Sequence, residues 1–500
     1  MNTTPRFNRV VIAGGGTAGW MMAALMSKLL GKQLDIKLVE SEEIGTVGVG
    51  EATIPALHTF HNLLGINEAE FMAATQATFK LGIKFEGWKA PGEDYIHSFG
   101  MTGKDHWSAG FQHFWLKGRG EGLAQAYTDY NPETVAAHAN RFAHLPRNGL
   151  NYAYHLDAGR YAKFLRAMSE AHGVQRIEGK IGAVLMDGPA GRDGPITALQ
   201  MHDGSRIDGD LFIDCTGFRS MLLGEALGVG YEDWSYWLPC DRAVAVPSES
   251  TAPLLPYTRA TAHRAGWQWR IPLQHRVGNG HVYASSHVSD DEAAAVLLQH
   301  LDGPPLAEPR LIKFRTGMRA QAWRRNVVAI GMSAGFVEPL ESTALHLIQM
   351  GVAKLIEAFP HRGFDPVEIA EYNRESRERY EYVRDFIVLH YHLNQREDSP
   401  FWQACAAMAV PESLRRTLDL YAASGRLPAG SGDLFRAPSW LEVMEGQNLR
   451  PQGWLALTEL QGVDETAAYL KGVSDTIAAC VAVMPEHGEF VRRYCAAPPA

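Results

Sequence analysis

The chain opens with a pattern that alternates between strand and helix. Residues 9–13 form a short apolar, β-branched run, which is typical of a buried parallel strand. A glycine-rich turn follows, and residues 20–30 are apolar almost all round, as in a helix that packs on a sheet. Residues 35–40 return to a strand pattern. The segment therefore predicts a βαβ unit of about 30 residues.

Later segments add more strands. Residues 180–216 contain turn clusters and the hairpin signal Asp203-Gly204, which predict antiparallel strands. Two apolar runs, 210–217 and 326–331, end in a glycine turn as the first strand does. Three strand ends from distant parts of the chain could thus converge on one ligand.

From residue 370 onward the pattern is helical, with a Pro/Gly-rich break at 428–432. We therefore expect an α/β fold with a Rossmann-type core. Residues 1–350 would hold this core together with an inserted β-sheet substrate region. Residues 351–500 would form a helical C-terminal part that packs on the core.

Composition narrows the function classes. The net charge is −9, which argues against binding of nucleic acid. No stretch approaches the roughly 20 apolar residues that span a bilayer, and the N-terminus has no secretory apolar region. The five cysteines are scattered without a CxxC pair. This predicts a cytoplasmic location, no disulfide framework and no metal site.

The first turn predicts a dinucleotide site. Gly14 permits the tight turn, Gly16 lets the backbone approach a pyrophosphate, and Gly19 allows close packing of helix and strand. The diphosphate would bind at the helix start, near Thr17-Ala18, where free N–H groups favour an anion. Glu40 ends the second strand, where a carboxylate can accept hydrogen bonds from a ribose.

Three further segments carry distinctive residues, and each has a plain structural alternative. Lys80 and Lys84 lie in an apolar segment, but they could share a solvated helix face. Trp267 and Trp269 could fill a core from one face of a strand, since positions i and i+2 point the same way. Glu341 could be a stabilising carboxylate at the start of a helix.

Taken together, the motifs resemble the flavin-dependent halogenases of the tryptophan halogenase family. The match rests on the first glycine turn and on four segments: Thr46–Pro55, Phe79–Trp88, Gly266–Pro272 and Phe336–Leu345. The first of these segments resembles the family's strap beside the flavin, which includes Gly50, Glu51 and Ala52.

The resemblance implies a FAD-binding monooxygenase-like fold, with a late segment closing over the flavin. By position, Met332 and Leu345 would flank the flavin, and Ile181 would lie near the adenine. Reduced FAD (FADH2) and O₂ would oxidise chloride or bromide to hypohalous acid. No second glycine-rich turn for NADPH follows a strand, so a separate NAD(P)H-dependent flavin reductase would supply the reduced FAD.

The resemblance also assigns roles to the reacting residues. Lys80 matches the essential lysine, which either hydrogen-bonds hypohalous acid or carries the halogen as a haloamine. Glu341 matches the glutamate beside the substrate ring, which stabilises the arenium and takes its proton. The other assignments are the halide-binding amides of Thr343 and Ala344, the substrate contacts His97, Phe99 and Ser342, and the flavin-proximal pair Trp267 and Trp269.

The sequence departs from the family in two places. Many relatives have glycine where Ala344 stands, which leaves the preference for chloride or bromide open. Members specific for tryptophan carry a tyrosine pair and a later Glu…Phe-Trp that contact the amino-acid part of the substrate. Residues 418–444 hold neither feature. Free tryptophan is therefore a doubtful substrate, and indole, a substituted indole or an indole on a larger molecule fits better.

Alternatives remain at this point. The chain could be a FAD-dependent monooxygenase that hydroxylates an aromatic, although Lys80 and the tryptophan pair argue against it. A non-catalytic flavin protein is disfavoured by the intact Lys80 and Glu341. An acyl-carrier-bound arene is a variant of the halogenase hypothesis. The protein could be a monomer or a homodimer.

Overall fold

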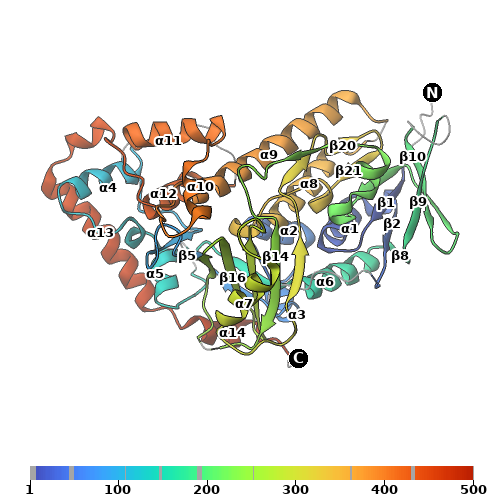
Figure 1. Ribbon diagram of the computed structural model, residues 1–500. Coiled ribbons are helices and arrows are strands. Elements are labelled where there is room, and N and C mark those ends of the chain that lie inside the picture. Colours follow the sequence, from blue (N-terminus) through green and yellow to red (C-terminus); the bar gives the residue numbers. More distant parts are fainter. Residues whose placement is uncertain are drawn as a thin grey trace.

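The structure is a computed structural model that describes residues 7–43, 50–106, 109–145, 149–188, 194–251, 253–360, 363–428 and 434–498. The predicted βαβ unit is confirmed and lies at the right of Figure 1. Its strands belong to a six-stranded sheet of order β20-β21-β12-β1-β2-β8. The strands are β1 (Arg9–Ala13), β2 (Asp35–Glu40), β8 (Gln175–Glu178), β12 (Leu211–Asp214), β20 (Trp323–Arg324) and β21 (Val327–Ala329).

This sheet brings the three predicted strand ends together. β1 pairs in parallel with both β2 and β12, and β12 pairs in parallel with β21. Their carboxyl ends therefore meet at one edge, which is where ligands bind in open parallel sheets. Helix α1 (Thr17–Leu30) is buried through most of its length, packing between the sheet and the helices α6 (Ala158–Ala171) and α8 (Ala344–Glu357).

The predicted hairpin region also forms. Strands β9 (Ile181–Met186), β10 (Ile196–Met201) and β11 (Arg206–Asp208) make a three-stranded antiparallel sheet. Gly204 turns the chain between β10 and β11 with φ +86°, a conformation that favours glycine.

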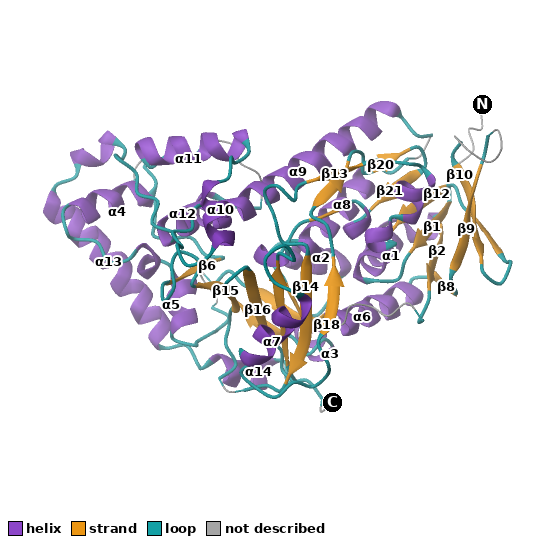
Figure 2. Cartoon of the chain, in the orientation of Figure 1, coloured by secondary structure: helices purple, strands orange, loops and turns teal. Residues whose placement is uncertain are grey.

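A seven-stranded sheet occupies the centre of the molecule (Figure 2), in the order β18-β14-β17-β16-β15-β5-β6. Its strands are β5 (Gly82–Glu86), β6 (Asp94–Ser98), β14 (Arg242–Ser248), β15 (Thr258–His263), β16 (Gly266–Pro272), β17 (Val277–Tyr283) and β18 (Arg310–Lys313). Trp267 and Trp269 both lie on β16, as their spacing predicts.

A small sheet of β3 (Gly50–Ala52), β7 (Ala153–Asp157) and β4 (Thr78–Lys80) lies against the large one, since Thr78 Oγ1 donates to Pro272 O at 2.7 Å. The helical alternative for Lys80 and Lys84 is wrong, because these residues belong to strands β4 and β5. A further small sheet contains β13 (Tyr231–Asp233), β19 (Gly317–Arg319) and β22 (Gly335–Phe336).

The C-terminal residues are helical, as predicted. The long helix α9 runs from the nucleotide-binding side to the helical lobe at the left of Figure 1. The C-terminal helices are α9 (Pro366–His392), α10 (Pro400–Ala407), α11 (Glu412–Ser424), α12 (Ala437–Gly446), α13 (Val463–Ala482) and α14 (His487–Tyr494).

Helices from the first half of the chain pack into the same lobe. Lys117 Nζ of α4, for example, donates to Thr458 O at 3.1 Å. One continuous hydrophobic core joins residues on both sides of position 350, so the proposed division there stays a prediction. The remaining helices are α2 (Leu57–Leu64), α3 (Glu68–Ala74), α4 (Phe111–Gly120), α5 (Pro132–His138) and α7 (Asp290–Gln299).

Candidate active site

The first glycine turn has one open side. Gly14 has φ +109°, and a Cβ there would lie 2.2 Å from Cys215 O. A Cβ at Gly19 would lie 1.9 Å from Gly14 O. A Cβ at Gly16, in contrast, would meet nothing within 4 Å. Gly16 is the N-cap of α1, and the described residues offer no partner for the N–H groups of Thr17 and Ala18. The turn therefore fits an anionic diphosphate at Gly16.

The second strand ends beside this turn. Glu40 Oε2 accepts from Trp20 Nε1 at 3.2 Å, and Glu40 Oε1 accepts from Arg176 Nε at 2.5 Å. Gly179 N donates to Glu40 O, which places the start of β9, with the half-buried Ile181, near the same sheet edge. The carboxylate predicted to contact a ribose thus already has two hydrogen-bond partners in the protein, and Arg166 forms an ion pair with it at 3.7 Å.

The third strand end touches the first helix. Gly331 has φ +70°, and a Cβ there would lie 3.1 Å from Ala18 Cβ. Met332 follows and is 44% exposed, whereas Leu345 is buried in the first turn of α8. Part of the predicted strap, residues 46–49, lies outside the described residues. Its remainder, Gly50 to Ala52, forms β3, and burial raises the pKa of the Glu51 carboxyl to about 7.

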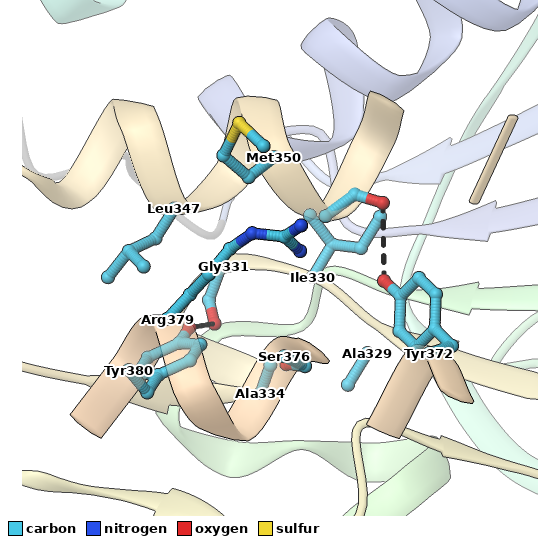
Figure 3. Close-up of a pocket in the computed structure, with 11 residues that line it drawn as sticks. Ala329, Ile330, Gly331, Ala334, Leu347, Met350, Tyr372, Ser376, Arg379 and Tyr380 are labelled. Carbon is cyan, nitrogen blue, oxygen red and sulfur yellow. Dashed lines mark hydrogen bonds between the residues drawn. The ribbon is translucent and has the colours of Figure 1, made fainter. Parts of the chain in front are cut away.

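A small cavity lies beside Gly331, between β21, α8 and α9 (Figure 3). Tyr372 and Tyr380 of α9 border it, donating to Gly351 O at 3.2 Å and to Gly335 O at 3.3 Å. The cavity measures ≈ 20 Å³, so it has room for about one water molecule. It is too small for a flavin ring, and neither Lys80 nor Glu341 lines it.

Lys80 is completely buried on β4. Its ammonium donates to Thr53 O at 3.0 Å and to Ser342 Oγ at 2.8 Å. The ring of Phe99 lies 5.0 Å from Nζ. Burial lowers the pKa of Lys80 to about 7, although the Glu341 carboxylate acts in the opposite direction. Near neutral pH the amine can therefore exist in both protonation states.

Glu341 is the second wholly buried charge of the site. His97 Nδ1 donates to Glu341 Oε2 at 2.8 Å. His390 Nε2 lies 2.7 Å from Glu341 Oε1, a close polar contact without hydrogen-bond alignment. Burial raises the pKa of Glu341, but the two histidines outweigh it and hold that pKa at about 2. Glu341 is thus an ionised base with fixed oxygens.

His390 has further hydrogen-bond partners besides its contact with Glu341. Tyr95 Oη lies 2.9 Å from His390 Nδ1, and Gln447 Nε2 donates to His390 O at 2.8 Å. Burial lowers the pKa of His390, whereas the pKa of His97 is raised, because the attraction of Glu341 outweighs the effect of burial there. Of the two histidines that contact Glu341, His97 therefore favours the protonated form more than His390 does.

Residues 338–343, here called the glutamate turn, carry Glu341 into the site. They include the 3₁₀ helix η7 (Pro339–Glu341). Ser342 has φ +59°, a left-handed conformation that is uncommon for serine. Helix α8 begins at Ala344, with Thr343 as N-cap, so Glu341 lies shortly before the start of a helix. Among the described residues, the N–H groups of Thr343 and Ala344 have no hydrogen-bond acceptor. These amides can accommodate an anion.

Trp267 and Trp269, here called the signature tryptophans, border the glutamate turn. Their ring centroids lie 6.2 Å apart, and both side chains are buried. Trp267 Nε1 donates to Glu338 Oε2 at 3.1 Å. Trp269 Nε1 has no acceptor in the described part of the chain. The interpretation of both rings as core residues is therefore incomplete, because Trp267 also bonds the glutamate turn.

The residues predicted to contact the substrate lie at the end of β6, which packs against α12. His97 is buried, and Phe99 is half-buried just beyond the strand. Glu442 of α12 accepts from Ser98 N at 2.7 Å, from Thr102 Oγ1 at 2.9 Å and from Asn131 Nδ2 at 2.9 Å. Burial raises the pKa of Glu442 to about 7. This carboxyl group therefore holds the strand end that presents His97.

The sequence reasoning missed several of these residues. It assigned no role to Tyr95, Glu338, His390, Tyr391 or Glu442. One signal was present for the residues of α9: His390 and Tyr391 end an otherwise apolar run that starts at Phe386. Polar groups within such a run are normally buried and must find partners. His346, for which the sequence reasoning made no specific case, is half-buried, and its Nδ1 has no hydrogen-bond partner among the described residues.

Neither a membrane-spanning helix nor a cluster of three or more metal-ligating side chains occurs in the part of the chain that the structure describes.

Comparison with known proteins identifies the family of the chain. The sequence profile of the tryptophan halogenase family matches residues 9–462. The chain is 38% identical to tryptophan 6-halogenase SttH of Streptomyces toxytricini, over 82% of this chain and 83% of that protein. It is 37% identical to tryptophan 7-halogenase RebH of Lentzea aerocolonigenes, over 86% and 84% respectively.

Solved structures show the same relationship. The flavin-dependent halogenase Xcc4156 from Xanthomonas campestris is 56% identical, with a TM-score of 0.96 over 99% of this chain and 100% of that one. BrvH, a flavin-dependent halogenase from Brevundimonas sp. BAL3, is 45% identical, with a TM-score of 0.93 and the same coverage. The aromatic hydroxylase alternative is not favoured. The chain belongs to the tryptophan halogenase family and is a flavin-dependent halogenase with a Rossmann-type, FAD-binding α/β fold.

Proposed function

We propose that this halogenase transfers chlorine or bromine to an indole-like, electron-rich arene, with Lys80 and Glu341 as the catalytic residues. The proposal rests chiefly on one observation. Two buried, oppositely charged groups that are 261 positions apart in the sequence meet at Ser342, whose Oγ accepts from Lys80. Burying such groups is costly, so their presence indicates a function.

The cofactor would be FAD at the Gly16 side of the first turn, with Gly14, Gly19, Thr17 and Ala18 forming the cradle. Bound reduced FAD would supply two electrons that reduce O₂ to the peroxide level, and this oxidant would take two electrons from the halide to give hypohalous acid. Glu40, Ile181, Met332, Leu345 and β3 would complete the flavin site. The unpaired amides of Thr343 and Ala344 would hold the halide.

The chemistry at Lys80 and Glu341 can be written as a balanced step. The arene attacks the halogen of hypohalous acid, so a carbon–halogen bond forms and the oxygen–halogen bond breaks. The Lys80 ammonium gives a proton to the leaving hydroxide, which becomes water, and the Glu341 carboxylate takes the ring proton. The alternative, in which neutral Lys80 first carries the halogen as a haloamine, uses the same two residues. A pKa of about 7 suits both routes.

The substrate would be an indole or an indole carried on a larger molecule, rather than free tryptophan. SttH and RebH are tryptophan halogenases. Residues 418–444 hold neither the tyrosine pair nor the Glu…Phe-Trp that the family uses for the amino-acid part, and the Phe401-Trp402 pair lies upstream in a different context. His97 and Phe99 would contact the ring from one side. Phe435, whose ring lies 6.2 Å from His97, would extend the apolar wall.

The partners and location follow from the same reasoning. A separate NAD(P)H-dependent flavin reductase would deliver reduced FAD, because the sequence shows no second dinucleotide turn. The protein would act in the cytoplasm as a monomer or homodimer. Its five cysteines are all free thiols in the structure, which suits a reducing compartment.

The first experiment is a mass-spectrometric assay with FAD, a generic flavin reductase, NADH and indole, run with chloride and separately with bromide. A halogen isotope pattern in the product supports the proposal and ranks the halides. Lys80→Ala should abolish halogenation while FAD still binds. Hydroxylated indole as the main product, or full halogenation by Lys80→Ala, would contradict the proposal.

A further inference from the structure

Two buried carboxyl groups of the glutamate turn are held by consecutive residues of α9. Glu338 Oε2 accepts from Tyr391 Oη at 2.6 Å, and His390 Nε2 lies 2.7 Å from Glu341 Oε1. All four side chains are buried. The end of α9 therefore fixes both ends of η7, one through each glutamate.

Trp267 is the other partner of this turn. Its Nε1 donates to the same oxygen of Glu338 that Tyr391 contacts. The large sheet and α9 thus converge on Glu338 from two directions. Its second oxygen, Oε1, has no hydrogen-bond partner among the described residues. Glu338 therefore connects three elements through hydrogen bonds, namely β16, α9 and the glutamate turn.

Trp269 offers a contrast on the same strand. Its ring lies over Gly280 of β17, where a Cβ would be 2.1 Å from Trp269 Cζ2. Its N–H group reaches no acceptor within the described residues. The two signature tryptophans are therefore not equivalent, because only Trp267 bonds the turn that carries Glu341.

The glutamate turn needs such external contacts. Ser342 has φ +59°, and a non-glycine residue stays in this region only when its surroundings enforce it. A displacement at Glu338 would pass through two residues, Pro339 and Leu340, to Glu341 and then to Ser342. Glu341 contacts His97, and Ser342 contacts Lys80. Catalytic groups lose about 100-fold in rate when they are misplaced by 1 Å.

We propose that Glu338 is a positioning residue that links Trp267 and Tyr391 to the catalytic turn, so that the Trp267 N–H group acts on halogenation through Glu341. This inference rests on the role of Glu341 in the proposed function. It assigns the two signature tryptophans different tasks, which their shared motif does not suggest.

The charge state of Glu338 makes the inference testable. The group contacts no cation among the described residues, and burial raises its pKa to about 7. Trp267 and Tyr391 need only a carbonyl-type acceptor. Glu338→Gln keeps such an acceptor without the charge, whereas Glu338→Ala removes it. A positioning role through hydrogen bonds therefore predicts that glutamine preserves activity and alanine does not.

The experiment compares Glu338→Gln, Glu338→Ala and Trp267→Phe in the FAD-loaded enzyme. Indole bromination, FAD binding and flavin reoxidation are measured side by side. We expect kcat to fall roughly 10-fold or more in Glu338→Ala and Trp267→Phe. We expect FAD binding, the KM for indole and flavin reoxidation to stay within about twofold of wild type, since the turn and not the cofactor site is disturbed. Glu338→Gln should keep kcat within about threefold.

A double-mutant cycle supplies the matched control. Trp267→Phe combined with Glu338→Ala should lose little more than the larger single effect, because both break one link. Trp269→Phe removes an indole N–H group as Trp267→Phe does, but this N–H group makes no hydrogen bond to Glu338. Its effect should multiply with that of Glu338→Ala. If Glu338→Ala does not bind FAD, the double variant Trp267→Phe/Tyr391→Phe tests the same two hydrogen bonds to Glu338 without removing the carboxyl group.

Three results overturn the inference: wild-type kcat in Glu338→Ala, independent effects of Trp267→Phe and Glu338→Ala, or equal losses in kcat and FAD binding for every variant. These outcomes differ from a failure of the proposed function. In that case the wild-type enzyme itself would give no halogenated indole, or Glu341→Ala would turn over as wild type does.

Discussion

Replacing Lys80 by methionine should stabilise the protein at pH 7 while it abolishes halogenation. The lysine has an ordinary pKa of 10.5, which burial lowers to about 7 in the folded chain. This difference corresponds to about 5 kcal/mol, and at pH 7 about 4 kcal/mol of it counts against the fold. Methionine has a similar shape and no charge, so it avoids this cost.

The two hydrogen bonds of Lys80 act in the opposite direction. The bonds to Thr53 O and Ser342 Oγ contribute about 1 kcal/mol each, and methionine loses both. The net gain at pH 7 is therefore about 2 kcal/mol. Enzymes often lose stability at catalytic groups in this way.

The pH dependence has a definite sign. Between pH 7 and 10.5 the unfolded chain binds the lysine proton and the folded chain does not, so wild-type stability rises with pH relative to the variant. The slope is about 1.4 kcal/mol per pH unit. The variant should be more stable at pH 7, equal near pH ~9 and less stable above it.

Urea denaturation of both proteins at pH 7, 8, 9 and 10, followed by tryptophan fluorescence, measures this difference. Other titrating groups contribute to both proteins and largely cancel in the comparison. A difference in unfolding free energy that stays constant over this pH range would refute a buried lysine with a lowered pKa. Lys80→Arg should be destabilising throughout, because arginine stays charged.

Three further predictions concern other parts of the site. Glu341→Ala should slow halogenation by about 100-fold or more at unchanged FAD affinity, because it removes the base for the ring proton; single-turnover product formation and FAD titration check both quantities. Gly16→Ala should fold normally but weaken FAD binding at least about tenfold. Gly19→Ala should instead lower the melting temperature, since its Cβ would lie 1.9 Å from Gly14 O. Thermal melts and FAD titration separate the two effects, and an FAD affinity of Gly16→Ala equal to that of wild type would exclude a diphosphate at Gly16. Glu442→Ala should cost about 3 kcal/mol or more, because it leaves the buried donors of Ser98 and Thr102 without an acceptor and leaves Asn131 Nδ2 only its 3.3 Å bond to Thr102 Oγ1. Urea denaturation measures this loss, and Glu442→Gln should recover part of it.

The local sequence was a good guide where neighbours in the chain decide the outcome. The strands 9–13 and 35–40 form with the predicted bounds, and the hairpin at Gly204 has the predicted left-handed turn. These features depend on periodicity and on glycine geometry, both of which are local properties.

Local spacing misleads where tertiary contacts override it, and the helical alternative for Lys80 and Lys84 is wrong for this reason. Lys80 and Lys84 have helical spacing, yet they lie on two strands of different sheets. Each of these strands is three to five residues long and is formed by pairing with distant segments, β4 with β7 and β5 with β15 and β6. No window around Lys80 contains those partners.

The sequence by itself therefore determined the Rossmann-type start, the family and the residue types that carry the chemistry, because motifs with fixed spacing record them. Only the tertiary structure decided how these residues act. It brought His97 and His390 into contact with Glu341. It also made Ser342 Oγ an acceptor for Lys80, and Glu338 an acceptor for Trp267. The pKa values of about 7 for Lys80 and about 2 for Glu341 depend on burial and on charges brought together from distant segments. Such electrostatic effects depend on distance in space, and spacing along the chain does not encode that distance.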